Sequence, residues 1–152
     1  MTATRTETTR PEGALTGTPT PSVLAIVVTH DGRRWIRDCL VGLNSQTYPV
    51  VDVLVVDDSS PDARRSPRLN RIAKRHLRGR RWGFLRTPRP LGFGGAINWA
   101  LSRVRTKADL LLFIHDDAAL DPGGIERMVE RIVADETTAI VGPKIVSWDD
   151  PD

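Results

Sequence analysis

Two apolar runs of this chain each end in a pair of adjacent carboxylates. The pairs are Asp57 and Asp58, after residues 53–56, and Asp116 and Asp117, after residues 110–115. In a parallel sheet that helices cover, buried strands read as continuous apolar runs, and ligands bind outside the carboxyl ends of the strands. We therefore expect four carboxylates at one sheet edge, where a divalent cation or a hydroxyl-rich ligand would offset their repulsion. The pattern predicts a site for a metal, a nucleotide or both.

Two further segments are expected near this edge. Residues 29–32, Thr-His-Asp-Gly, follow the first predicted strand. They are compatible with a simple turn and helix cap, but their place beside Asp57 and Asp58 favours a role in the site. Residues 92–96, Gly-Phe-Gly-Gly-Ala, open a predicted helix without the third glycine of the dinucleotide fingerprint or the lysine of a P-loop. A helix N-terminus facing a phosphate and a plain glycine turn both remain open.

The elements that must position these residues alternate between strands and helices. Predicted strands cover residues 23–28, 50–56, 82–86 and 110–114, with a fifth beginning at 139–142; predicted helices cover residues 33–45, 67–77, 94–104 and 122–134. Ser66 and Asp121 are expected to cap the second and fourth helices. Cys39 and His76 are expected in the core. This order predicts an α/β fold, with a mainly parallel sheet flanked by helices on both faces.

Composition indicates a soluble domain preceded by a tail. Residues 1–21 are rich in Thr, Pro and Gly, which predicts disorder, and residues 22–152 are predicted to form one domain. No apolar run approaches the roughly 20 residues that cross a bilayer, and the N-terminus lacks the apolar region of a signal peptide. The single cysteine excludes an intrachain disulfide. Because the sequence stops where a fifth strand has barely begun, we expect a truncated domain from a longer protein.

The basic residues are concentrated although the net charge is only +3. Residues 63–108 contain no acidic side chain, and 11 of the 22 Lys and Arg residues fall between Arg64 and Arg89. Two explanations are equally compatible with this pattern: a solvated helix face, or a surface that docks on anionic lipid or phosphates. Nucleic acid is not an expected partner, because no recognition motif occurs and few aromatic residues lie among the charges.

Together these segments resemble the family 2 glycosyltransferases, which have the Rossmann-like GT-A fold. The resemblance covers about residues 22–147 and rests on several motifs in the family's order. They are residues 27–32 of the first strand and turn, Ser45-Gln46-Thr47-Tyr48-Pro49, Val55-Val56-Asp57-Asp58-Ser59, the glycine-rich residues 91–98 and the Asp-x-Asp strand at 111–117. Two later segments, residues 120–125 and 141–145, are similar to bacterial rhamnosyl- and galactofuranosyltransferase-like members. Ser59 stands where glycine is usual, and His115 replaces the first Asp of Asp-x-Asp.

The resemblance implies transfer of a sugar from a nucleotide diphosphate to an acceptor hydroxyl, usually with inversion. The implied nucleotide-sugar-binding residues are Thr29 and Asp58 at the base, Asp31 and Asp57 around the nucleoside, Asp116 at the ribose or metal, and Gly94 and Asn98. Asp117, with Asp116, would hold Mg²⁺ or Mn²⁺ against the diphosphate. The family's general base comes from an acceptor-binding half, so we expect it beyond Asp152 and expect this portion alone to be inert.

The same resemblance implies partners and a location. The donor would carry UDP or dTDP, and the acceptor would be lipid-linked or a polysaccharide in cell-envelope synthesis. The protein would be cytoplasmic, with peripheral association at the inner face of the plasma membrane. Two alternatives remain: a non-catalytic α/β nucleotide-binding module, and a nucleotidyltransferase. The second would need a Gly-rich basic loop after the first strand, where residues 29–34 are short and include an acid.

Overall fold

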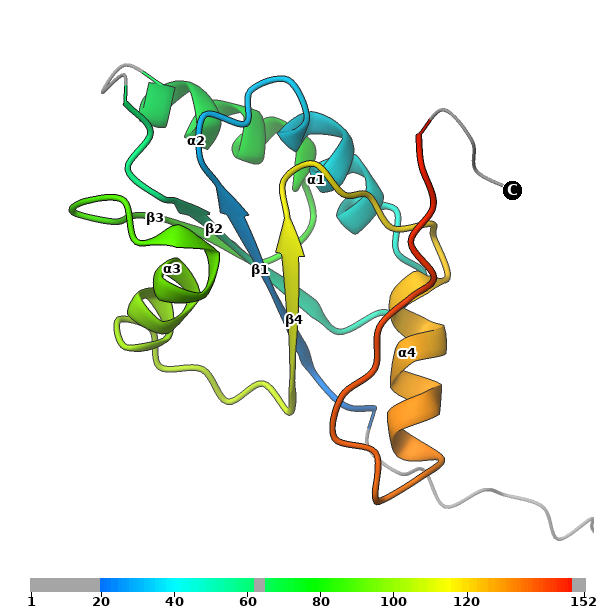
Figure 1. Cartoon of the computed structure of the whole chain (residues 1–152). Helices are drawn as coiled ribbons and strands as arrows, with labels where there is room; N and C mark the ends of the chain where they lie inside the picture. Colours follow the sequence, from blue (N-terminus) through cyan, green and yellow to red (C-terminus); the bar gives the residue numbers. More distant parts are fainter. Residues whose placement is uncertain (1–19, 62–64, 149–152) are drawn as a thin grey trace, which may run out of the picture.

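The computed structural model describes residues 20–61 and 65–148, and its four-stranded sheet is parallel throughout (Figure 1). The strand order is β3 (Trp82–Arg86), β2 (Val51–Asp57), β1 (Val23–Thr29) and β4 (Leu110–His115). Apolar strands form such a sheet when helical crossovers join them and cover both of its faces. The predicted Rossmann-like α/β architecture is therefore confirmed. Most of the tail predicted at residues 1–21 lies outside the described residues.

Helices cover the two faces unequally. Helices α1 (Ile36–Asn44), α2 (Arg65–His76) and α4 (Gly124–Val133) pack on one face, and α3 (Gly92–Leu101) packs on the other (Figure 1). The core of the first face is built from alternate strand residues and the apolar stripes of α1, α2 and α4. The core of the second joins the remaining residues of β1 and β2 to α3. No helix in the described ranges is long and apolar enough to cross a bilayer.

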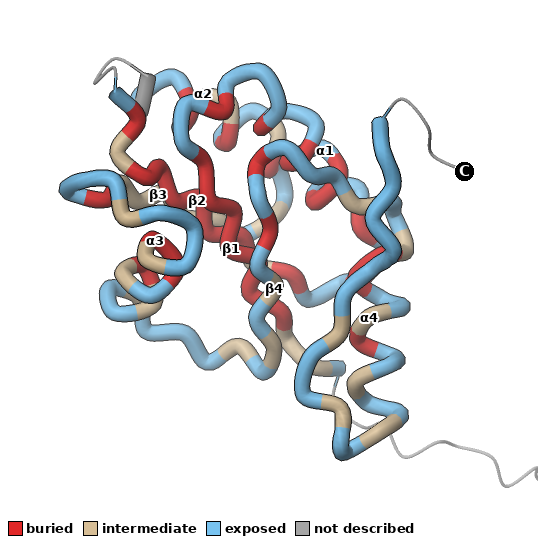
Figure 2. Tube along the Cα trace, viewed as in Figure 1, coloured by how far each residue is buried: buried red, intermediate tan, exposed pale blue. Residues whose placement is uncertain are grey.

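Burial is greatest on β1 and falls towards β4. All seven residues of β1 are buried, whereas Ile114 is the only buried residue of β4 (Figure 2). On the α3 side of β4, Leu111 and Phe113 are 41% and 48% exposed, since the α3 core contains no β4 residue. The apolar run at residues 110–114 is thus not a fully buried central strand in the described part of the sheet.

The predicted helix starts were wrong where a distant residue supplies the cap. Helix α3 begins at Gly92, two residues earlier than expected, because the Asp58 carboxylate accepts the N–H groups of Leu91 and Gly92. Helix α4 begins at Gly124, and the predicted cap Asp121 instead pairs with Arg127. Local sequence carried no sign of the Asp58 contact, because Asp58 lies 34 residues before Gly92 and a side-chain cap is sought among neighbours in the chain.

Three other expectations about helices and strands also differ from the structure. Helix α2 begins at Arg65, so Ser66 lies inside its first turn; Pro67 is tolerated there because the first N–H groups of a helix have no intrahelical partner. Helix α1 begins at Ile36, after turns at residues 33–35. Residues 139–142 form no strand in the described structure.

Cys39 is fully buried as expected, and burial raises the pKa of its thiol to about 12. His76 is only partly buried.

Candidate functional site

The carboxyl ends of β1, β2 and β4 bring the candidate site residues to one edge of the sheet (Figure 1). The register pairs Thr29 with Asp57 across β1 and β2, and Val28 with His115 across β1 and β4. Because all three strands are parallel, the polar residues that end or follow them share this edge. The topology therefore gathers the four predicted carboxylates, as the acid-tipped strands indicated.

Asp116 is a buried carboxylate between β4 and β1, with only 3% of its surface exposed. The Thr29 hydroxyl donates a hydrogen bond to its Oδ2, and its backbone N–H donates to the Val28 carbonyl. Burial raises the pKa of Asp116, and the Thr29 hydrogen bond opposes that rise because it stabilises the carboxylate. These contacts hold Oδ2 against β1 and place Oδ1 beside His115.

Gly32 provides the space that the Asp116 carboxylate occupies. A Cβ atom at position 32 would lie 1.3 Å from Oδ2 of Asp116 and 2.7 Å from Oγ1 of Thr29. Both distances are far below van der Waals contact, so no other residue fits beside an undisturbed Asp116. The glycine that the sequence indicated as part of a turn is thus required by the site itself.

The side chains of His115, Asp116 and Asp117 bring together three atoms that could bind a metal ion. Nδ1 of His115 lies 2.8 Å from Oδ1 of Asp117 and 3.1 Å from Oδ1 of Asp116, and one donor atom from each residue lies within 4.8 Å of the others. The Trp148 indole N–H donates to the Asp117 carbonyl, 3.2 Å away, and so supports the backbone here. Carboxylate oxygens with an imidazole nitrogen suit a divalent cation such as Mn²⁺, so these residues fit the expected metal.

Asp57 faces away from this group and towards β3. Its Oδ2 pairs with the Arg86 guanidinium at 2.5 Å, and its Oδ1 accepts the backbone N–H and hydroxyl of Ser60. Arg86 also donates to the Ser60 carbonyl. Asp57 is fully buried, and these donors compensate its charge. Its observed contacts fix the loop after β2.

Asp58 joins the loop after β2 to the start of α3. Oδ1 accepts the Thr87 hydroxyl and the Leu91 N–H, and Oδ2 accepts the Gly92 N–H at 2.8 Å. A carboxylate here also complements the positive end of the α3 dipole. The backbone carbonyl of Asp58 lies 2.7 Å from Nδ1 of His30. Since a carbonyl only accepts, Nδ1 of His30 carries the proton of this hydrogen bond.

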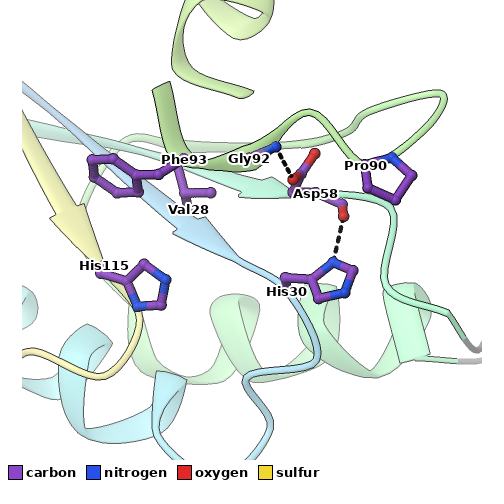
Figure 3. A pocket seen from close by; sticks show the side chains of 7 residues that line it. All are labelled: Val28, His30, Asp58, Pro90, Gly92, Phe93 and His115. Carbon is purple, nitrogen blue, oxygen red and sulfur yellow. Dashed lines mark hydrogen bonds between the residues drawn. The ribbon is translucent and has the colours of Figure 1, made fainter. Parts of the chain in front are cut away.

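A pocket of about 320 Å³ opens between these elements (Figure 3). Seven residues line it: Val28, His30, Asp58, Pro90, Gly92, Phe93 and His115. The rings of Phe93 and His115 lie 5.8 Å apart, tilted by 38°. His115 therefore belongs both to this pocket and to the carboxylate group beside it. The volume is at the lower end of the range for small-molecule sites.

Only Asp58 among the predicted nucleotide-sugar-binding residues lines this pocket. Asp31 has a positive φ of 61°, and its N–H donates to the Ser60 hydroxyl. Gly94 and Asn98 are exposed on α3, away from the pocket lining. Sequence reasoning missed Pro90 and Phe93 as lining residues; Phe93, an aromatic side chain inside a glycine-rich turn, was the available signal.

Gln46 is a second residue whose importance the sequence did not reveal. Its buried amide donates to the carbonyls of Gly42 and Asp121, at 2.9 and 2.7 Å, and its Oε1 accepts the N–H of Ile125. One side chain thus joins the end of α1, the loop after Asp117 and the first turn of α4. Thr47 continues the junction, since its N–H donates to the Pro122 carbonyl. The signal was present, because Gln46 is the only glutamine in the chain and lies in the family signature.

The parallel Rossmann-like sheet, with acidic side chains after β1, β2 and β4, matches the GT-A fold of glycosyltransferases. The chain belongs to glycosyl transferase family 2, whose family model matches residues 24–151. The resemblance expected from the motifs is therefore confirmed, and it covers all of the described sheet except Val23.

One relative and two solved structures are similar to this chain. EpsH of Bacillus subtilis (strain 168), which its name assigns to the glycosyltransferases, is 28% identical over 123 residues, or 80% of this chain and 33% of EpsH. S. aureus TarS 1–349 in complex with UDP superposes with a TM-score of 0.62 at 22% identity, covering 74% of this chain and 32% of TarS 1–349. The mannosyltransferase PcManGT of Pyrobaculum calidifontis, in complex with GDP-Man and Mn²⁺, gives a TM-score of 0.57 at 27% identity, covering 67% and 29%. The chain thus spans about a third of the length of these relatives.

Proposed function

We propose that this chain is the donor-binding portion of a glycosyltransferase that transfers a sugar from a nucleotide diphosphate to an acceptor hydroxyl. The observation that supports this best is the shared position of His115, which lines the pocket and contacts both Asp116 and Asp117. A nucleoside in the pocket would place its diphosphate beside these acids. Because two carboxylates repel a diphosphate, binding then requires a cation between them. UDP and GDP-Man bound in two structural neighbours support a nucleotide-sugar donor.

Asp116 and Asp117 would hold Mn²⁺ or Mg²⁺ in this proposal. When bound, the cation neutralises the charge that develops on the leaving diphosphate. Thr29 would orient Asp116 through its hydroxyl, because a hydrogen bond to a metal-binding carboxylate fixes the direction of that carboxylate. A cation in the mannosyltransferase complex supports this part of the proposal.

The remaining predicted residues take positional roles around the donor. Asp58 would contact the base, because it lines the pocket and its carboxylate could accept the imide N–H of uracil or thymine beside the donors that it already has. Asp57 and Asp31 would support the nucleoside loop through Ser60. Gly94 and Asn98 would contact the donor only from the exposed side of α3. Inverting stereochemistry and a role in cell-envelope synthesis are proposed from the family resemblance.

The chain is expected to bind UDP at least about tenfold more tightly with Mn²⁺ than in a chelator. Asp117→Asn should remove most of this gain, because the amide cannot balance the charge of the cation. The fold should persist, since the Asp117 side chain is 57% exposed. Isothermal titration calorimetry with MnCl₂ or EDTA measures both effects. Glu130→Gln, at an exposed position of α4, is the control that removes one negative charge elsewhere. Equal UDP affinity in both buffers would remove the metal from the proposal.

We further propose a cytoplasmic protein that associates peripherally with the inner face of the plasma membrane through α2, where a lipid-linked or polysaccharide acceptor would be used. One side of α2 is buried at Leu69, Ala73 and Leu77. The other side exposes basic residues: Arg68, Arg71, Lys74, Arg75 and, just beyond the helix, Arg78. Such residues gain about 1 kcal/mol each near anionic lipid.

The triple variant Arg71→Gln, Lys74→Gln, Arg75→Gln should therefore weaken binding to anionic vesicles by up to roughly 100-fold at low salt. Co-sedimentation with phosphatidylserine-containing vesicles measures this partition, and neutral phosphatidylcholine vesicles provide the control. If the native chain partitions equally onto both kinds of vesicle, α2 is only a solvated surface.

A further inference from the structure

Three donor atoms from consecutive residues converge at the carboxyl end of β4. Nδ1 of His115 lies 2.8 Å from Oδ1 of Asp117 and 3.1 Å from Oδ1 of Asp116. Two ligands at right angles on a six-coordinate cation with bonds of about 2.1 Å are roughly 3.0 Å apart. The distances from Nδ1 to the two carboxylate oxygens therefore match the spacing of neighbouring ligands on one metal ion. They also match the lengths of hydrogen bonds.

The surrounding contacts set the directions of these donors. The Thr29 hydroxyl occupies Oδ2 of Asp116 and leaves Oδ1 as the oxygen nearest His115. The Phe93 ring lies 5.8 Å from the His115 ring on the pocket side. His115 also ends β4, so its backbone is fixed by the pairing of β4 with β1. The backbone of His115 and the carboxylate of Asp116 are thus in place before any ion arrives, which favours a well-defined metal site.

We propose that His115 is a direct ligand of the cation and that the imidazole shifts the preference of the site from Mg²⁺ towards Mn²⁺ and Co²⁺. This inference rests on the metal-dependent donor binding proposed above. Sites made only of oxygen suit Mg²⁺, whereas imidazole nitrogen favours transition metals. As a ligand the ring would be the neutral tautomer with its proton on Nε2, and Nδ1 would contact the metal in place of its present contacts with the carboxylates.

Pulsed electron paramagnetic resonance of the chain loaded with Mn²⁺ and UDP tests this coordination directly. The native chain is expected to show the ¹⁴N modulation of a bound imidazole, and His115→Asn is expected to lose it. His76→Asn, a change of the histidine on α2, should keep the signal. The native spectrum is informative by itself, so the test holds even if a variant misfolds.

Metal competition gives a second, independent measurement. His115→Asp should keep a cation site but lower the ratio of Mn²⁺ to Mg²⁺ affinity by at least about tenfold, because oxygen replaces nitrogen. Mn²⁺-dependent UDP binding without ¹⁴N modulation would overturn the role of His115 and leave the proposed function intact. Absence of any Mn²⁺ effect on UDP binding would instead overturn the metal-dependent function and this inference together.

Discussion

Gly32→Ala is expected to lower metal-dependent UDP affinity by at least about 100-fold and the free energy of unfolding by about 2–4 kcal/mol. The added methyl group would lie 1.3 Å from Oδ2 of Asp116, so the carboxylate must leave its place. Thr29 would then lose its acceptor in a fully buried position, which adds the cost of an unsatisfied hydroxyl. Chemical denaturation and calorimetry measure the two quantities.

A second substitution separates this collision from a general effect of alanine. Asp116→Ala removes the colliding atoms, so adding it to Gly32→Ala should restore part of the stability while UDP affinity stays low. Gly142→Ala is the matched control, because no atom lies within 4 Å of the methyl group that it adds. The steric explanation fails if Gly32→Ala alone binds UDP and Mn²⁺ like the native chain.

Gln46→Glu is expected to destabilise the chain by about 3–5 kcal/mol at pH 8. The substitution keeps the size of the side chain but sets a carboxylate oxygen against the carbonyls of Gly42 and Asp121, which now accept the Gln46 amide. Burial and these carbonyls would raise the pKa of the new carboxyl in the folded state. Its penalty is therefore small below the unfolded pKa and grows as pH rises, so the variant should lose less stability at pH 4.5 than at pH 8.

Denaturation at the two pH values measures this difference. Asn44→Asp adds the same charge at an exposed position two residues away, and should change stability by less than about 1 kcal/mol. Gln46→Met, which removes the hydrogen bonds without adding charge, should fall between the native chain and Gln46→Glu. If Gln46→Glu matches Asn44→Asp in stability, the junction between α1 and α4 does not depend on this amide.

Features that depend on the local chain were predictable from the sequence. Apolar runs identified β1, β2, β3 and β4, and the residues that ended the runs predicted at which edge of the sheet the carboxylates gather. Ser59 is instructive, because it stands where the family has glycine and adopts a φ of 53°. Glycine reaches this left-handed conformation without steric cost, which gives the family preference a physical reason.

Features that depend on contacts between distant segments were not predictable. Asp58 caps α3 across 34 residues, and Gln46 binds the first turn of α4 across 79 residues. A single sequence shows a strong cap only when both partners are close in the chain. The same limit concealed Gly32, whose lack of a side chain matters only because Asp116 arrives from β4.

The strand order also has a consequence for how the protein is made. β1 lies between β2 and β4, and Thr29 is separated from its partner Asp116 by 87 residues. A ribosome adding about 5–20 residues per second needs roughly 4–17 s to make that interval. During this time β1 can pair with β2, while its other edge waits for β4. β4 is the last strand of the described sheet to emerge, so a nascent chain gathers the carboxylates of this edge only when β4 docks.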